Sequence, residues 1–285
     1  MKNISKNLDE IVKLWIRNNI PNYEQCESHI YVGELNKYSS ESSTVSIHEP
    51  LAGHGFKDSI WIFEYDQNIY LGIDNNARQE VQNFLSETHK DMIFSSYGTY
   101  ELSRITHKFG YYVWGPSWVL FAEENDWIDI NKHDVEILSR NEFNKIVDKK
   151  VFWHNDSNCL KAFSVIENEK IIASATLTEI GNNFVEIGVD THPDSQLSGL
   201  GSTVYSAAGR WAFENGMIPF SSVGPFNIPS TRTQINSGMK YVGVDMTGTK
   251  QFAVPPQPLG KPDKGINVVN YYPEWAKNGD ILPKK

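Results

Sequence analysis

Several features that mark other protein classes are scarce or missing in this sequence. The 285 residues include only two cysteines, Cys26 and Cys159, which are far apart and lack metal-site spacing. Neither a disulfide scaffold nor a cysteine metal centre is therefore expected. No apolar stretch is long enough to cross a bilayer. The start, MKNISKNLDE, lacks the apolar segment of a secretory signal, so we expect a cytoplasmic protein with no membrane partner.

Basic residues are also in short supply. The formal net charge is −9, and residues 1–133 hold 11 basic and 19 acidic side chains, against 15 and 16 in the remainder. No run or stripe of Lys and Arg is present, so nucleic-acid binding is not expected. The negative first half would attract a cationic amine, or it only keeps the protein soluble.

The apolar content, 40% of residues, is enough for one large core or two modest ones. We expect two domains and a tail. Composition shifts at residues 123–134, which carry four acidic residues in their first seven. This predicts a mixed α/β domain over 1–133 that supplies an acceptor-substrate wall, a second domain over 134–248, and a proline-rich tail over 249–285 that packs on the body.

Hydrophobic periodicity predicts an alternation of helices and strands in both parts. Ser139 and Glu142 have the spacing of a capping box, which predicts a helix start. The predicted helices are 8–16, 76–87, about 102–109, 140–147, 202–215 and one from 229. The predicted strands are 60–65, 69–73, 160–166, 170–178, 184–191, 220–223 and 239–248, and residues 111–121 are expected to form strand, turn and strand.

The stretch from Phe184 to Gly201 organises the second part. Alternating apolar residues predict a strand up to Thr191, and a helix begins close to Gly199 and Gly201. Bare backbone N–H groups at a helix N-terminus form a site for an anion such as phosphate. A dinucleotide fingerprint would need a third glycine where Val204 stands, so that alternative is excluded.

The turn reads Gln196-Leu197-Ser198-Gly199-Leu200-Gly201, and Asn227-x-x-Ser230 and Gly238-Met239 follow it. With these motifs, about residues 140–248 resemble the GNAT superfamily of acyl-CoA-dependent N-acyltransferases. The run from Glu186 to Thr191 is most similar to a bacterial branch with an extra N-terminal region. The resemblance implies an α+β fold with a mainly antiparallel, mixed sheet flanked by helices; the first part would be a second α/β domain or a degenerate GNAT copy.

The resemblance further implies an acetyl-CoA-dependent N-acetyltransferase that acts on a primary amine of a small molecule, with acetyl-CoA as co-substrate and no metal. The strand 184–191 would separate from its neighbour so that the pantetheine arm lies between them. The residues implied in CoA binding are Val189, Thr191, Gln196, Leu197, Ser198, Gly199, Leu200, Gly201, Ser202, Asn227 and Ser230. Asn227 could equally act as a helix cap.

Glu186, in the middle of the central strand, is the candidate general base, and Asp190, on the same face, is the reserve. The alternative for Glu186 is a salt-bridged strand residue. Where the family usually has a Tyr as general acid, seven positions after the Asn, this sequence has Gln234, which cannot protonate a thiolate. The alternative function is therefore a non-catalytic acyl-CoA-binding or partner-binding protein, and a third is an α/β module that holds another phosphate.

Overall fold

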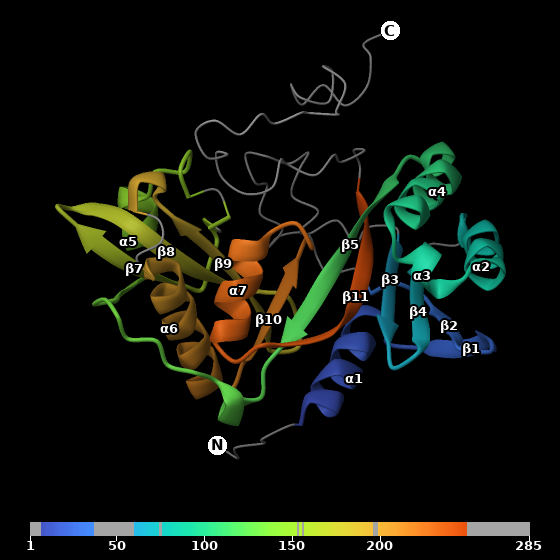
Figure 1. Cartoon of the computed structure of the whole chain (residues 1–285), viewed down its shortest axis with the longest axis horizontal. Helices are drawn as coiled ribbons and strands as arrows, with labels where there is room; N and C mark the ends of the chain where they lie inside the picture. The colour runs from blue at the N-terminus through green and yellow to red at the C-terminus, as the bar shows by residue number, and fades with distance from the viewer. Residues whose placement is uncertain are drawn as a thin grey trace, which may run out of the picture.

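The computed structural model describes residues 7–36, 60–73, 76–152, 154–155, 157–195 and 199–249. Gln196, Leu197 and Ser198 of the turn, and the expected tail beyond residue 249, lie outside the described residues. The mixed α/β fold with a large, mainly antiparallel sheet flanked by helices is the one predicted (Figure 1). No helix within the described residues is both long and apolar enough to span a membrane.

The first part of the chain contains four helices and five strands within the described residues. They are α1 (Leu8–Asn19), β1 (Tyr23–Glu27), β2 (Ile30–Gly33), β3 (Ile60–Tyr65), β4 (Asn68–Ile73), α2 (Arg78–Glu87), α3 (Lys90–Ile93), α4 (Ser96–Thr106) and β5 (Tyr112–Phe121).

The second part contains three helices and six strands within the described residues. They are β6 (Glu136–Leu138), α5 (Arg140–Ile146), β7 (Lys161–Glu167), β8 (Lys170–Glu179), β9 (Phe184–Thr191), α6 (Leu200–Glu214), β10 (Ile218–Val223), α7 (Ile228–Asn236) and β11 (Lys240–Thr249).

Local signals fixed most of these elements. The predicted capping box forms at Ser139, whose side chain accepts from the Glu142 N–H while Glu142 accepts from the Ser139 N–H. A second capping box, formed by Asn7 and Glu10, begins α1. Such caps satisfy backbone N–H groups that a helix start leaves without a partner. The predicted helices and strands of the described residues are confirmed, with shifts of one to three residues at most ends; α4 begins at Ser96, six residues before the predicted start.

The predicted turn at Gly115-Pro116 is wrong. Residues 112–121 form one strand, β5, and the chain passes this dipeptide by a shift in register against β11, where Ser117 pairs with Asp245 and Trp114 with Thr247. Proline lacks the N–H that a sheet ladder needs, and bulges are where strands accommodate it. Gly115-Pro116 therefore interrupts the strand pattern of the sequence but does not end strand β5.

All eleven strands of the described residues belong to one sheet, in the order β1-β2-β4-β3-β11-β5-β10-β9-β8-β7-β6. The last strand of the first part, β5, lies between β10 and β11 and pairs antiparallel with both. Figure 1 shows β5 in green between these two orange strands. The two parts of the chain therefore share a single sheet, joined by backbone hydrogen bonds.

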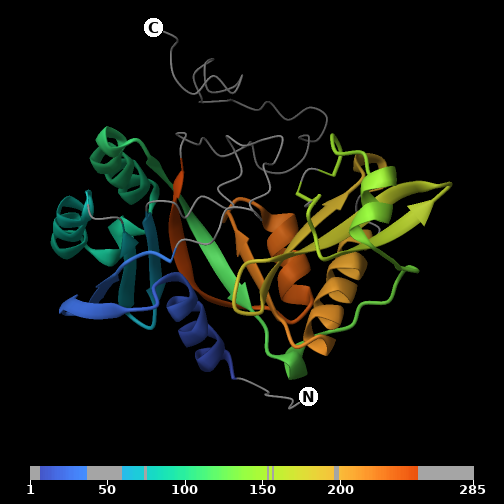
Figure 2. The same cartoon turned by 180° about the vertical axis from the view of Figure 1, so that it is seen from behind.

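Helices cover both faces of the sheet (Figures 1 and 2). On one face α6 packs on β7, β8 and β9. On the other, α5 packs on β7 and β8, and α1 packs on the centre through Trp15. The Trp15 ring stacks on Phe220 with centroids 4.3 Å apart and meets Phe184 edge-on at 5.2 Å. The first helix thus covers the place where β9 and β10 come together.

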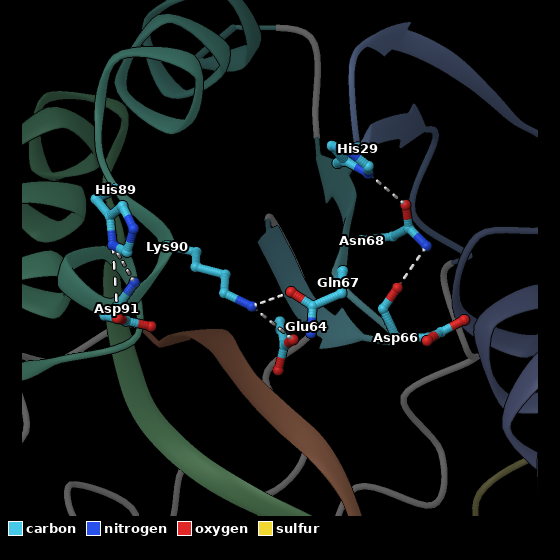
Figure 3. Close-up of polar contacts among 8 residues, drawn as sticks. All are labelled: His29, Glu64, Asp66, Gln67, Asn68, His89, Lys90 and Asp91. Atoms are coloured by element: carbon cyan, nitrogen blue, oxygen red, sulfur yellow. Dashed lines mark hydrogen bonds and ion pairs between the residues drawn. The ribbon is translucent and has the colours of Figure 1, made fainter.

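Polar contacts tie the β3–β4 hairpin to its surroundings (Figure 3). Asp66 and Gln67 both have positive φ, the conformation that a two-residue hairpin turn requires. Lys90 Nζ donates to Gln67 Oε1 at 2.5 Å, and the Asn68 amide donates to the Asp66 carbonyl at 2.9 Å. The side chains at this hairpin tip fix a turn in a part of the sheet that β11, β5 and β10 separate from β9.

Candidate functional site

Strands β9 and β10 form a fork. They pair in parallel from Ile218 opposite Phe184 to Phe220 opposite Glu186, and no further. Beyond this point β9 continues to Thr191 beside β8, while β10 continues beside β5. Because neighbouring strands stay about 4.8 Å apart only where they are hydrogen-bonded, the two strands separate past Glu186. The fork opens in the direction of the glycine turn.

The main chain of β9 offers hydrogen-bonding groups to this fork. The His192 N–H donates to the Ile172 carbonyl at 2.8 Å, which sets the alternation of the antiparallel ladder between β8 and β9. In such a ladder every second residue exchanges hydrogen bonds with the partner strand, and the residues between them turn their N–H and C=O the other way. Val189 and Thr191 are among the residues that do not bond to β8. Their main-chain groups therefore point to the β10 side, where pairing with β10 has ended.

The glycine turn lies at the open end of the fork. Gly199 has a φ of 81°, a left-handed conformation that favours glycine, and α6 begins directly after it. The first N–H groups of a helix have no partner within the helix and carry a partial positive charge. A Cβ on Gly201 would lie 3.1 Å from the Thr191 hydroxyl oxygen. The N-terminal end of α6 thus lies against the end of β9.

Lys132 lies over the glycine turn. Its Nζ is 3.6 Å from the position that a Cβ on Gly199 would occupy. The segment before Lys132 is fixed to α6, because Ser206 Oγ accepts from the Ile130 N–H at 2.8 Å and Trp127 Nε1 donates to the Ser206 carbonyl at 3.0 Å. An ammonium group therefore adds positive charge to the turn. Sequence reasoning missed Lys132, because an isolated lysine far from the turn in sequence forms no pattern.

Glu186 lies where the fork begins. Its side chain is half-buried, and it stands opposite Thr178 of β8 in the ladder. Its neighbours Val185 and Ile187 are buried in the core beneath α6. Since side chains alternate along a strand, Glu186 points to the opposite face, which α1 and α5 cover. The carboxylate is therefore located at the branch point, on the face away from α6.

A buried phenol lies beside the fork on the α6 face. Tyr205 Oη is 2.7 Å from the Ser221 hydroxyl, and Ser221 follows the last β10 residue that pairs with β9. Burial raises the pKa of Tyr205 well above its ordinary value; the hydrogen bond to Ser221 opposes this, and the Glu186 charge adds to it. Tyr205 is therefore a neutral O–H group at physiological pH.

Asp190, the reserve base, accepts hydrogen bonds from the segment before β7. Its carboxylate is 9% exposed. It accepts from the His154 N–H at 2.7 Å, from His154 Nδ1 at 2.6 Å and from Asn155 Nδ2 at 2.9 Å. His154 and Asn155 were missed by sequence reasoning, since nothing in the local sequence connects them to a strand that begins thirty residues later. Three donors already occupy the carboxylate.

The polar residues after β10 form a helix cap. Asn227 Oδ1 accepts from the Ser230 N–H at 3.3 Å and so begins α7. Ser230 Oγ in turn accepts from Gln234 Nε2 at 3.0 Å. Gln234 is 4% exposed, and its Oε1 has no hydrogen-bond partner among the described residues. The cap expected as one role of Asn227 is thus present.

Residues 125–233 match the family model described as the acetyltransferase (GNAT) family. The match begins after β5 ends and stops before β11 begins. It therefore includes the fork and the glycine turn. It includes neither β5 nor β11, the two strands that follow β10 in the sheet. A comparison with curated proteins found no match to the chain.

Solved structures similar to this chain share little sequence with it. A putative GNAT-family acetyltransferase from Novosphingobium aromaticivorans is 16% identical, with a TM-score of 0.41, and the alignment covers 49% of this chain and 66% of that one. A GCN5-related N-acetyltransferase from Kribbella flavida is 17% identical, with a TM-score of 0.41 and coverages of 52% and 63%. An aminoglycoside N-acetyltransferase, AAC(6')-Iy, in complex with CoA is 15% identical, with a TM-score of 0.31 and coverages of 38% and 88%. The chain spans slightly less than two thirds of the first two structures.

Proposed function

We propose that this protein is an N-acetyltransferase that moves the acetyl group of acetyl-CoA to a primary amine of a small molecule. Residues 125–233 match the model of the acetyltransferase (GNAT) family, which supports the proposal. The observation that carries the proposal is the fork between β9 and β10, which opens toward the glycine turn. A fork lined by main-chain groups suits an extended amide arm, and a helix N-terminus suits the phosphates that follow it. The two cysteines are free thiols, and we place the reaction in the cytoplasm.

Each part of acetyl-CoA has a proposed place. The pyrophosphate binds the N–H groups of residues 199–202, with Lys132 close enough to pair with a phosphate oxygen. The pantetheine arm bonds to the main chain of Val189 and Thr191, and Asn227 lies at the end of the strand on the other side of the fork. This arrangement brings the thioester to the branch point, near Glu186.

The reaction is a direct attack by the amine on the thioester carbonyl. Main-chain N–H groups of β9 polarise the carbonyl oxygen, and Glu186 accepts a proton from the attacking nitrogen. Of the two sequence candidates for the base, Glu186 fits better, because three hydrogen bonds already occupy the Asp190 carboxylate. The Gln234 amide can form hydrogen bonds but cannot give up a proton. The thiolate therefore leaves without a general acid at that position.

Glu186→Gln is expected to lower turnover by at least about tenfold, at the low end of general-base effects, while acetyl-CoA affinity stays the same. The loss should shrink as pH rises, because more of the amine then arrives unprotonated. Steady-state rates across a pH series and calorimetric titration with acetyl-CoA measure both quantities. Glu179→Gln, a change at the exposed end of β8, is the control. A Glu186→Gln enzyme with the wild-type rate at every pH would remove Glu186 from the mechanism.

Lys132→Ala is expected to weaken acetyl-CoA binding about tenfold, since a hydrogen bond to a charged group contributes about 1.5–3 kcal/mol. The deficit should shrink at high salt, where an exposed ion pair is screened. Calorimetric titration at low and high salt measures it, with Lys145→Ala on α5 as the control. Equal affinities of the Lys132→Ala and wild-type proteins at low salt would show that Lys132 does not contact the phosphates.

The general test is a thiol-release screen with acetyl-CoA against a panel of primary amines, with the acetylated product identified by mass spectrometry. The presence of Gln234 in place of an acid favours one alternative, an acyl-CoA-binding protein without activity. Tight acetyl-CoA binding with no thiol release across the whole panel would favour that alternative. Absence of acetyl-CoA binding would overturn both.

A further inference from the structure

A groove lies beside the glycine turn, on the face of the sheet that α6 covers. It has a volume of about 730 Å³ and is bounded by residues 131–135, by the end of β7 at residues 165–167 and by Ala207 of α6. We call it the α6 groove. Ligand sites in proteins usually measure about 300–1,000 Å³ and combine apolar walls with a few polar groups. The α6 groove therefore has the size of a ligand site, and the places proposed for the phosphates and the pantetheine arm do not fill it.

The α6 groove lies next to the glycine turn. Val165, in the groove, stands opposite Ala173 of β8, which stands opposite Thr191 of β9. The groove is thus two strand spacings, about 10 Å, from the end of β9. Lys132 lines the groove and also extends over Gly199, since its Cδ is 3.0 Å from the position of a Cβ there. One side chain therefore reaches both the groove and the place proposed for the phosphates.

The walls of the α6 groove suit a flat, largely apolar group that carries N–H donors. Val165 is buried in the core beneath α6, and Val135 and Ala207 pack on the same core while they stay partly exposed. Asp134 and Glu167 also line the groove and are exposed. In the part of the chain that the structure describes, neither carboxylate has a hydrogen bond or an ion pair. Because carboxylates only accept hydrogen bonds and repel a phosphate, the groove favours a base with an amino group.

We infer that the α6 groove binds the adenine base of CoA and that Glu167 accepts a hydrogen bond from the amino group of the base. The inference rests on acetyl-CoA being the co-substrate of the proposed transfer. The base lies on Val135 and Ala207, and Lys132 connects it to the diphosphate on the glycine turn. Of the two carboxylates, Glu167 has the longer side chain and so the greater reach across the groove.

The α6 groove gives the protein a choice among acyl donors. The fork and the glycine turn hold the phosphate and the pantetheine arm, which are also present in phosphopantetheine thioesters that lack the nucleotide. Only the groove contacts the base. It therefore makes the protein specific for the complete CoA nucleotide.

The first test fills the groove. Ala207→Phe is expected to weaken acetyl-CoA binding about tenfold, because the phenyl ring occupies the space of the base and the hydrogen bond to a charged group is lost. Binding of S-acetyl-4′-phosphopantetheine, which has no base, should stay the same. Calorimetric titration with both thioesters measures this. Glu214→Phe, which puts the same ring at the exposed far end of α6, is the matched control.

The second test changes the base. Wild type should bind acetyl-CoA about tenfold more tightly than its deaminated analogue, in which a carbonyl oxygen faces the Glu167 carboxylate and no hydrogen bond forms between them. An amide offers both a donor and an acceptor. Glu167→Gln should therefore bind the two ligands equally well, whereas Asp134→Asn should keep the wild-type preference.

The outcomes separate this inference from the proposed function. If wild type transfers the acetyl group and Ala207→Phe binds acetyl-CoA undiminished, the transferase stands and the base lies outside the groove. An equal loss with both thioesters would show damage to the glycine turn and would also overturn the inference. Equal binding of acetyl-CoA and its deaminated analogue by wild type would remove Glu167 from base recognition. A wild-type protein that binds neither thioester would overturn the proposed function, and the inference with it.

Discussion

A fragment that begins at residue 134 is expected to be insoluble or unfolded, although it contains almost all of the region that matches the family. It lacks β5, which pairs with β10 on one side and β11 on the other. Without β5 the two strands lose their common neighbour and each exposes an unpaired edge. Exposed edges of this kind promote aggregation.

The apolar side chains of β5 make the effect large. Val119, Leu120 and Phe121 are 0%, 1% and 0% exposed and join the cores on both faces of the sheet. Burying each such side chain contributes about 1.5–3 kcal/mol, so the three together approach the 5–15 kcal/mol that typically separates folded from unfolded domains. Losing them is expected to remove most of the stability of the fragment.

Expression and circular dichroism of fragment 134–285 measure this, with fragment 1–133 co-expressed as the control. The two halves should co-purify as a soluble complex, because β5 then returns to its place by pairing. The same reasoning predicts that a chain cut between residues 123 and 134 stays associated. A lone 134–285 fragment that is monomeric, folded and active would contradict the prediction and would make the first part dispensable.

Gly201→Val is expected to reduce acetyl-CoA affinity by about a hundredfold or more. A Cβ at this position would lie 3.1 Å from the Thr191 hydroxyl oxygen, and a branched side chain would extend over the first N–H groups of α6. Losing two hydrogen bonds to a phosphate costs about 3 kcal/mol or more, and every 1.4 kcal/mol corresponds to about tenfold in affinity.

Calorimetric titration of the folded variant measures the loss. Gly216→Asn is the matched control, because Gly216 follows the other end of α6, has a positive φ that Asn tolerates, and has open space around it. Both variants should melt within a few degrees of wild type. Undiminished acetyl-CoA affinity in folded Gly201→Val would show that CoA does not bind at this turn.

The sequence by itself determined the elements whose signals are local. Apolar periodicity located the helices and strands, the Ser139–Glu142 spacing located a helix start, and the pair Gly199 and Gly201 located the turn at α6. These signals depend on residues within about one helical turn of each other, so no knowledge of neighbours is needed. The error at Gly115-Pro116 arose because a bulge and a turn have similar sequence signals. The short elements β1, β2, α3 and β6 were not predicted.

Only the tertiary structure decided which distant segments meet. An alternating strand pattern shows which face is buried but not which strand lies alongside, so β5 could not be located between β10 and β11 from the sequence. For the same reason Lys132 over the glycine turn and His154 on Asp190 were not foreseen, since each contact joins segments far apart in the chain. The physical reason is that strand pairing and packing depend on residues far apart in the chain, which come together only when the whole sheet forms. Helix caps, turns and periodicity depend on a few consecutive residues.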